Sequence, residues 1–149
     1  MRFFLAAALL AATALSPAAA QRPIDFAAEA PAEGALVLPL GSEADLAARG
    51  TMLDPAGRAA TRRALRSADF GYERDERLVL RGIGPWSQLV VIGTGTEPLT
   101  AAQLQDLGGA AAKETASNDG PVTIAAGNLL GADAATPGQR DPDPRTDEA

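Results

Sequence analysis

The chain has 149 residues, with 13 basic and 19 acidic side chains for a net charge of −6, and it contains neither Cys nor His. Without Cys there can be no disulfide, thiolate zinc site or cysteine nucleophile, and without His the commonest general base and metal ligand are missing. Ser-His-Asp hydrolysis and His-based metal catalysis are therefore excluded for this chain alone. The length allows one ordinary domain.

Residues 1–20 have the features of a secretory signal peptide. Arg2 precedes an apolar run over residues 3–15, and Ala18 and Ala20 place small side chains at the two recognition positions of a cleavage site. The run is shorter than the roughly 20 residues that a membrane-spanning helix needs. The alternative is an uncleaved membrane anchor. Cleavage after Ala20 removes Arg2, so it predicts a periplasmic or secreted chain with a net charge of −7.

Ordered structure is expected to begin at Ala35, after a mobile lead-in over residues 21–34 that mixes Pro, Ala and acidic side chains. The apolar run 35–40 has the length of a buried strand rather than of a helix. Pro39 cannot donate a hydrogen bond to a neighbouring strand, so this strand is expected to lie at a sheet edge or to end there.

A helix is predicted from Ala56 to about Ala68. Asp54 can accept a hydrogen bond from an unpaired N–H of the first turn, and Pro55 loses only a donor that has no partner there. Two strands follow at 77–81 and 88–92. The second is an unbroken apolar run, as expected of a strand that is covered on both faces.

The strongest local signal marks a second helix, over residues 101–116. Thr100 and Gln103 have the spacing of a capping box, and Leu99 and Leu104 occupy the hydrophobic-staple positions on either side. Both signals act within a few residues of the helix start, so they predict its first turn well.

The pair Gly108-Gly109 lies in the middle of this helix, where each glycine should cost about 1 kcal/mol relative to Ala. Close approach of the helix to a sheet is the expected compensation.

A last short strand is predicted at 122–125, and the Pro-rich, charged composition of 131–149 predicts a disordered acidic tail. The order strand, helix, two strands, helix, strand over residues 35–130 predicts one small α/β domain with a mixed sheet covered by helices.

The loop formed by Gly93, Thr94, Gly95 and Thr96 is the one candidate ligand site. It lies between a buried strand and a helix start, where backbone N–H groups and the helix dipole favour an anion. The loop lacks the third glycine of the dinucleotide fingerprint and the lysine of a P-loop, and Glu97 would repel a phosphate. A turn that needs glycines for its conformation is the alternative interpretation.

A basic stripe runs along the first predicted helix and consists of Arg58, Arg62, Arg63 and Arg66. Like charges at four-residue spacing repel unless acidic groups oppose them. The opposing charge could belong to a partner, or it could be local, from Asp69, Glu73 or Asp75.

Nucleic acid is not expected as a partner, because a domain of net charge −7 lacks the field that attracts a polyanion. The carboxylates form no cluster with metal-ligand spacing, so neither a metal site nor a catalytic residue is predicted.

Four segments resemble a known family: ALVLPLGSEADL, AGRAATRRALRSADFGYERDERLVLRG, SQLVVIGTGTEPLTAAQLQDLGGAAAKE and PVTIAA. In this order, over residues 35–126, the chain resembles the N-terminal domain of the leucyl (cytosol) aminopeptidase family. The carrying features are the strand and Gly-x-Gly loop at 89–95, the capped helix entry at Leu99-Thr100 and the run over 108–111. The resemblance implies a macrodomain-like α/β fold.

The resemblance also implies that this domain is not catalytic. In the family the two divalent metals (Mn or Zn), the catalytic lysine and the signature Asn-Thr-Asp-Ala-Glu-Gly-Arg belong to a C-terminal domain, while the N-terminal domain contributes to subunit contacts. The signature is not present in this chain, so no cofactor is expected in it, and it should be inactive alone. The implied partners are a peptidase catalytic domain or further copies of the chain, with no membrane contact after signal cleavage.

Three hypotheses about function remain open. The favoured one is a non-catalytic interaction and assembly module of an exported, proteolysis-related protein. The second is a macro-like module that binds a nucleotide or ADP-ribose-type ligand at the loop 93–96. The third is a remnant of a truncated gene product whose activity needs a peptidase encoded nearby. Its motivation is the Pro- and Asp-rich tail, which stands where the family continues through a linker helix.

Overall fold

The computed structural model describes residues 24–25, 31–127 and 129. Its elements are β1 (Ala35–Leu40), α1 (Asp45–Arg49), the 3-10 helix η1 (Gly50–Met52), α2 (Pro55–Ser67), β2 (Arg77–Leu80), β3 (Gln88–Gly93), α3 (Ala101–Glu114) and β4 (Val122–Ile124). The expected signal peptide and acidic tail lie outside the described residues. Within the described part of the chain, none of the helices has the length and apolar character that crossing a membrane requires.

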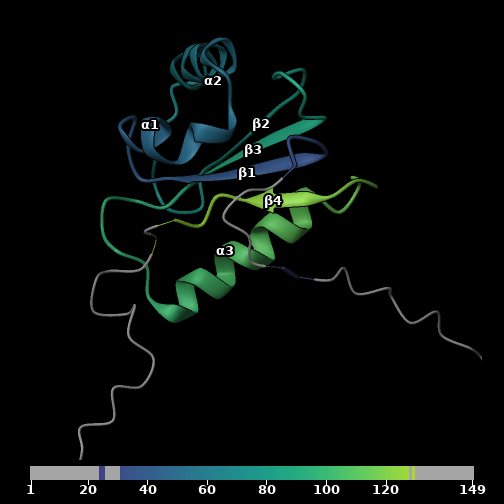
Figure 1. Cartoon of the computed structure of the whole chain (residues 1–149). Coiled ribbons are helices and arrows are strands. Elements are labelled where there is room, and N and C mark those ends of the chain that lie inside the picture. The colour runs from purple at the N-terminus through teal and green to yellow at the C-terminus, as the bar shows by residue number, and fades with distance from the viewer. Residues whose placement is uncertain (1–23, 26–30, 128, 130–149) are drawn as a thin grey trace, which may run out of the picture.

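The four strands form one mixed sheet in the order β2-β3-β1-β4. β1 pairs in parallel with β3 on one side and with β4 on the other, while β2 joins β3 in antiparallel fashion at the edge. Helices α1 and α2 lie on one face of this sheet, and α3 lies on the other (Figure 1). The expected α/β domain with a mixed sheet covered by helices is confirmed.

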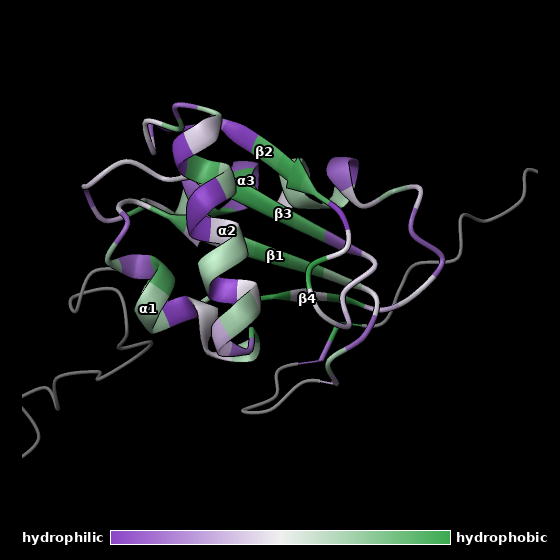
Figure 2. Cartoon of the chain, turned by 90° about the horizontal axis from the view of Figure 1, so that it is seen from above, coloured by the Kyte–Doolittle hydropathy of each residue, from purple (hydrophilic) through white to green (hydrophobic). Residues whose placement is uncertain are grey.

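Alternate side chains of the two central strands fill a separate core on each face of the sheet. The core on the α1 and α2 side includes Leu36, Leu38, Leu40, Leu89 and Val91. The core on the α3 side includes Val37, Val90, Ile92, Leu107 and Ala111. Both strands are buried along their whole length, and most of each strand is coloured as apolar in Figure 2, which is the pattern of strands covered on both faces.

Of the two alternatives for Pro39, the edge position is wrong, because β1 lies inside the sheet. The strand does end close to Pro39, at Leu40. Val37 and Pro39 turn their backbone groups to the same side, since these groups alternate along a strand. The Val37 carbonyl accepts a hydrogen bond from Ala125 N just beyond β4, and pairing with β4 ends at Val37. The missing N–H of Pro39 therefore faces no strand, and its carbonyl accepts a hydrogen bond from Nη1 of Arg49 at 2.8 Å.

Helix α2 begins and ends as its sequence predicts. The Asp54 carboxylate accepts a hydrogen bond from Gly57 N at 2.6 Å. At the other end Asp69 adopts the left-handed conformation, with φ 53°, and Phe70 N donates to Leu65 O at 3.0 Å. This is the Schellman motif, in which a left-handed residue lets the chain turn back over the last carbonyls.

Helix α3 carries the predicted capping box. Gln103 N donates to Thr100 Oγ1 at 3.3 Å, and Thr100 N donates to Gln103 Oε1 at 2.9 Å. The compensation expected for Gly108 and Gly109 is not found: a Cβ built on either residue would have no atom within 4 Å outside its own helix neighbourhood. These glycines face open space rather than the sheet.

The basic stripe of α2 is opposed locally, but by a different residue from those expected. Arg62 Nε and Arg66 Nη2 each lie 2.9 Å from Glu43 Oε1, and Arg58 donates to the carbonyls of Gly50 and Leu53. The acidic residues in 69–75 form no ion pair with the stripe within the described residues. The two ion pairs are well exposed, and such pairs contribute about 0–1 kcal/mol.

Candidate functional site

The candidate site is a crevice at the carboxyl ends of the neighbouring parallel strands β1 and β3. The chain leaves β1 toward the face that carries α1 and α2, and it leaves β3 toward α3 on the opposite face (Figure 1). In open α/β sheets, ligands bind where neighbouring strands diverge in this way. A hollow of about 280 Å³ lies at this position, slightly below the usual range of about 300–1,000 Å³ for ligand pockets.

The structure brings most of the predicted loop to this crevice. Thr94, Gly95 and Thr96 line it, while Gly93 is the last residue of β3 and lies outside the lining. The other lining residues, which the sequence analysis did not place in a site, are Gly41, Ser42, Asp45, Arg49, Glu97, Pro98, Leu99 and Leu129. A Gly-Ser pair directly after a buried strand is the one signal that could have indicated the opposite wall.

The two loops that form the crevice approach each other very closely. A Cβ on Gly41 would lie 2.2 Å from the carbonyl oxygen of Gly95, and Thr94 N donates to Leu40 O at 3.0 Å. Gly95 itself has a φ of 71°, in the region that favours glycine. The glycines at 41 and 95 are therefore required by the backbone, which supports the interpretation of the predicted loop as a turn that needs glycines.

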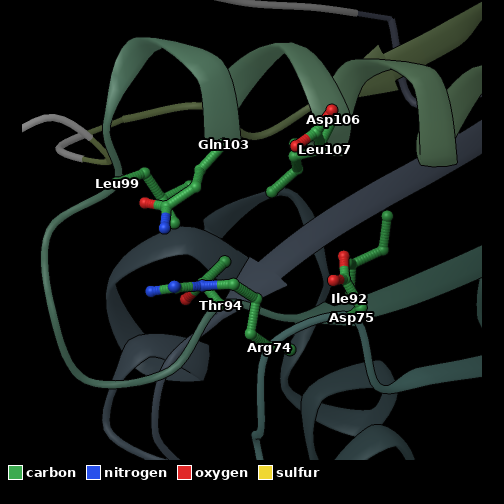
Figure 3. Close-up of a pocket in the computed structure, with 9 residues that line it drawn as sticks. Arg74, Asp75, Ile92, Thr94, Leu99, Gln103, Asp106 and Leu107 are labelled. Atoms are coloured by element: carbon green, nitrogen blue, oxygen red, sulfur yellow. The ribbon is translucent and has the colours of Figure 1, made fainter.

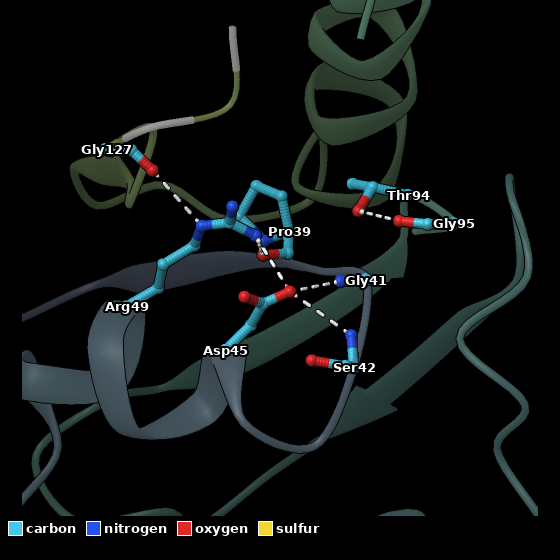
Figure 4. Close-up of polar contacts among 8 residues, drawn as sticks. All are labelled: Pro39, Gly41, Ser42, Asp45, Arg49, Thr94, Gly95 and Gly127. Carbon is cyan, nitrogen blue, oxygen red and sulfur yellow. Dashed lines mark hydrogen bonds and ion pairs between the residues drawn. The ribbon is translucent and has the colours of Figure 1, made fainter. Parts of the chain in front are cut away.

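The backbone donors after β1 are already engaged within the chain. Gly41 N and Ser42 N donate to Asp45 Oδ2 at 2.7 and 3.1 Å, and Arg49 Nη1 lies 3.3 Å from the same oxygen. Figure 4 shows this arrangement around Asp45. The carboxylate thus occupies the place at which an external anion would meet these two N–H groups.

The first two backbone donors after β3 are engaged as well. Thr94 N donates to Leu40 O, and Gly95 N donates to Tyr72 O, both at 3.0 Å. Glu97 adds a further carboxylate to the lining. An anionic ligand that used these N–H groups would have to break their hydrogen bonds. It would also have to tolerate the negative charge of Asp45 and Glu97, so the crevice is poorly suited to a phosphate.

A second, much smaller hollow of about 30 Å³ lies between α3 and the loop before β2. Figure 3 shows the Arg74 side chain reaching below Leu99 and Gln103, with Asp75 and Asp106 farther along. This volume has room for about one or two water molecules. It is too small for an organic ligand.

The loop that supports the end of β3 contains strained residues. Tyr72 and Asp75 have φ values of 61° and 65°, which are uncommon for residues other than glycine. The Tyr72 ring packs edge-to-face on Phe70, with ring centroids 5.2 Å apart. Burial raises the pKa of the Tyr72 hydroxyl, the Glu43 carboxylate adds to the rise, and the guanidinium groups of Arg66 and Arg62 oppose it.

Tyr72→Phe is expected to make the stability of the domain less sensitive to alkali. The raised folded-state pKa means that the contribution of Tyr72 is fully present below the unfolded pKa of about 10 and is lost as the pH rises through the folded-state value. Phe keeps the ring contact with Phe70 but has no proton to lose. Urea unfolding at about pH 8 and about pH 11 measures the difference. Since Tyr72 is the only tyrosine, equal losses in both proteins would contradict the prediction.

Within the described residues, no group of three or more Asp or Glu side chains is placed to hold a metal ion. Comparison of the chain with models of protein families, with curated proteins and with solved structures gives no match. The resemblance to the leucyl aminopeptidase N-terminal domain therefore stays a prediction from the sequence.

Proposed function

We propose that the domain at residues 35–130 is a non-catalytic interaction module of the leucyl-aminopeptidase N-terminal type, exported by its signal peptide and used to assemble a proteolysis-related protein. The observation that carries the proposal is that backbone N–H groups of the crevice already have hydrogen-bond partners. At the position where α/β sheets bind ligands, four backbone donors, two from each loop, are already paired within the chain. The sequence resemblance over residues 35–126 supports the family and the macrodomain-like fold that the proposal names.

The side chains at the crevice also favour a structural role over a catalytic one. Asp45 Oδ2 accepts two backbone hydrogen bonds and lies beside Arg49, so this oxygen is not presented to a substrate. A general base has to lie within hydrogen-bond reach of the proton that it removes. The carboxylate closest to the β1 loop is instead used to shape that loop.

The sheet edges are the surfaces where an assembly contact would gain most. Val79 on β2 and Ile124 on β4 are each 39% exposed, and they are the large apolar side chains exposed within the described residues 31–127. Both lie on edge strands, which offer unpaired backbone groups to another chain. A peptidase catalytic domain or a second copy of this chain could pair there.

The purified chain is expected not to hydrolyse leucine p-nitroanilide in the presence of added manganese, because the proposal places the metals and catalytic residues in another domain. The control is the same reaction with manganese alone. Hydrolysis above that control would overturn the proposal.

Reading the DNA that follows the coding segment for the Asn-Thr-Asp-Ala-Glu-Gly-Arg signature would show whether the module belongs to a split or truncated peptidase.

A second candidate function is a macro-like module for a nucleotide or ADP-ribose-type ligand. The position of the crevice favours it, whereas its volume of about 280 Å³, its engaged donors and its carboxylates argue against it. Titration with ADP-ribose, followed by the amide resonances of Gly41, Ser42 and Gly95, separates the two proposals. The interaction module predicts no change at these amides, and saturable shifts there would favour the ligand-binding module.

A further inference from the structure

The chain that leaves β4 is held across the open end of the sheet. Ala125 N donates to Val37 O at 3.0 Å, and Leu99 N donates to Leu129 O at 3.2 Å. Between these two bonds, Arg49 Nε donates to Gly127 O at 3.1 Å. Leu129 is 5% exposed and belongs to the core on the α3 side. We call residues 125–127 and 129 the exit segment.

Arg49 connects the exit segment to the centre of the sheet. Its Nη1 donates to Pro39 O at 2.8 Å and lies 3.3 Å from Asp45 Oδ2, while its Nε reaches Gly127 O (Figure 4). The side chain is 14% exposed. The planar guanidinium offers several donors in a fixed geometry, so one residue can hold three chain segments together.

The strand pairing alone gives the exit segment little support. β4 contributes three residues, and its register with β1 ends at Val37 and Ile124. Pro39, the next residue of β1 that faces this side, has no N–H to continue the ladder. Arg49 therefore supplies the cross-link at the point where the sheet hydrogen bonds stop.

We infer that Arg49 acts as a clasp: it holds the exit segment against the carboxyl end of β1 and so fixes one wall of the crevice and the direction in which the chain leaves the domain. Asp45 Oδ2 is shared by this clasp and by the N–H groups of Gly41 and Ser42. A change in the crevice that moves the Asp45 carboxylate also removes a partner of Arg49. The crevice and the exit segment are thereby coupled, whatever function the domain serves.

The test is hydrogen exchange of the full chain carrying Arg49→Ala or Arg49→Lys. Leu99 N and Ala125 N report on the exit segment, because each donates across its ends. Ala35 N and Thr94 N, which donate to Pro121 O and Leu40 O, report on the rest of the sheet. The matched control is Arg63→Ala, on the exposed face of α2.

Arg49→Ala is expected to raise the exchange rates of the Leu99 and Ala125 amides by about tenfold. In the wild-type chain, local opening of the exit segment has to break hydrogen bonds donated by the charged guanidinium, and in the variant these bonds are absent, so opening costs less free energy. Arg49→Lys should give a smaller rise confined to the same two amides, since a single ammonium cannot reproduce the fork. If Arg49→Ala fails to fold, Arg49→Lys decides the question alone. A rise limited to these two amides supports the clasp, whereas no rise, or an equal rise at all four amides, would overturn it.

Discussion

Gly93→Ala is expected to lower the free energy of unfolding by about 3 kcal/mol, the upper end of the range for overpacked sites. A Cβ on Gly93 would lie 1.9 Å from the carbonyl oxygen of Glu73 and 3.0 Å from the carbonyl carbon of Tyr72. These are backbone atoms, so no change of rotamer relieves the clash. The loop cannot move away freely either, because Gly93 N donates to Glu76 O at 2.7 Å. Urea unfolding, followed by circular dichroism, measures the loss.

The same substitution at Gly109 is the matched control, with an effect of opposite sign. A Cβ there meets open space, and Ala is more favourable than Gly by about 1 kcal/mol in the interior of a helix. Gly109→Ala should therefore raise the free energy of unfolding, and Gly108→Ala should do the same. A cost below about 1 kcal/mol for Gly93→Ala would contradict the close backbone contact as its cause.

Helices α2 and α3 were predictable from the sequence because their signals are local, whereas α1 and η1, which have no side-chain cap at their N-termini, were not predicted. Asp54 caps α2 three residues before its partner Gly57, and Thr100 and Gln103 cap α3 over the same spacing. The place of a strand in the sheet is not local. Pro39 marks an edge only if a neighbouring strand needs its N–H, and that depends on where β4 ends, more than eighty residues later in the chain.

Only one of the two walls of the candidate site was predictable, again because only local signals can be recognised in the sequence. The loop 93–96 is recognisable as glycines between a buried strand and a capped helix, but its opposite wall comes from residues 41–49, which only the pairing of β1 with β3 brings near. Asp45 and Arg49 look in sequence like an ordinary surface pair at i, i+4. Their contacts to Gly41 and Gly127 depend on the fold.

The central position of β1 can be tested with two valines that share one neighbour. Val37 of β1 and Val79 of β2 are both register partners of Val90, on opposite sides of β3. Val37 is 0% exposed, and Val79 is 39% exposed. The substitution to Ala removes the same atoms at both positions, so a difference in cost reports on how completely each strand is covered.

Val37→Ala is expected to lower the free energy of unfolding by about 2–3 kcal/mol, from the lost burial of two carbon atoms together with the cavity left under α3. Val79→Ala should cost about 1 kcal/mol or less, because solvent reaches the edge strand and leaves no cavity. The fluorescence of Trp86, the single tryptophan, follows unfolding in urea from within the core. If β1 were an edge strand, which is one of the two positions that Pro39 suggests, the two costs would be similar. A large difference therefore places Pro39 inside the sheet. There the Arg49 clasp links β1 to the exit segment at the point where the missing N–H of Pro39 ends the ladder of strand hydrogen bonds.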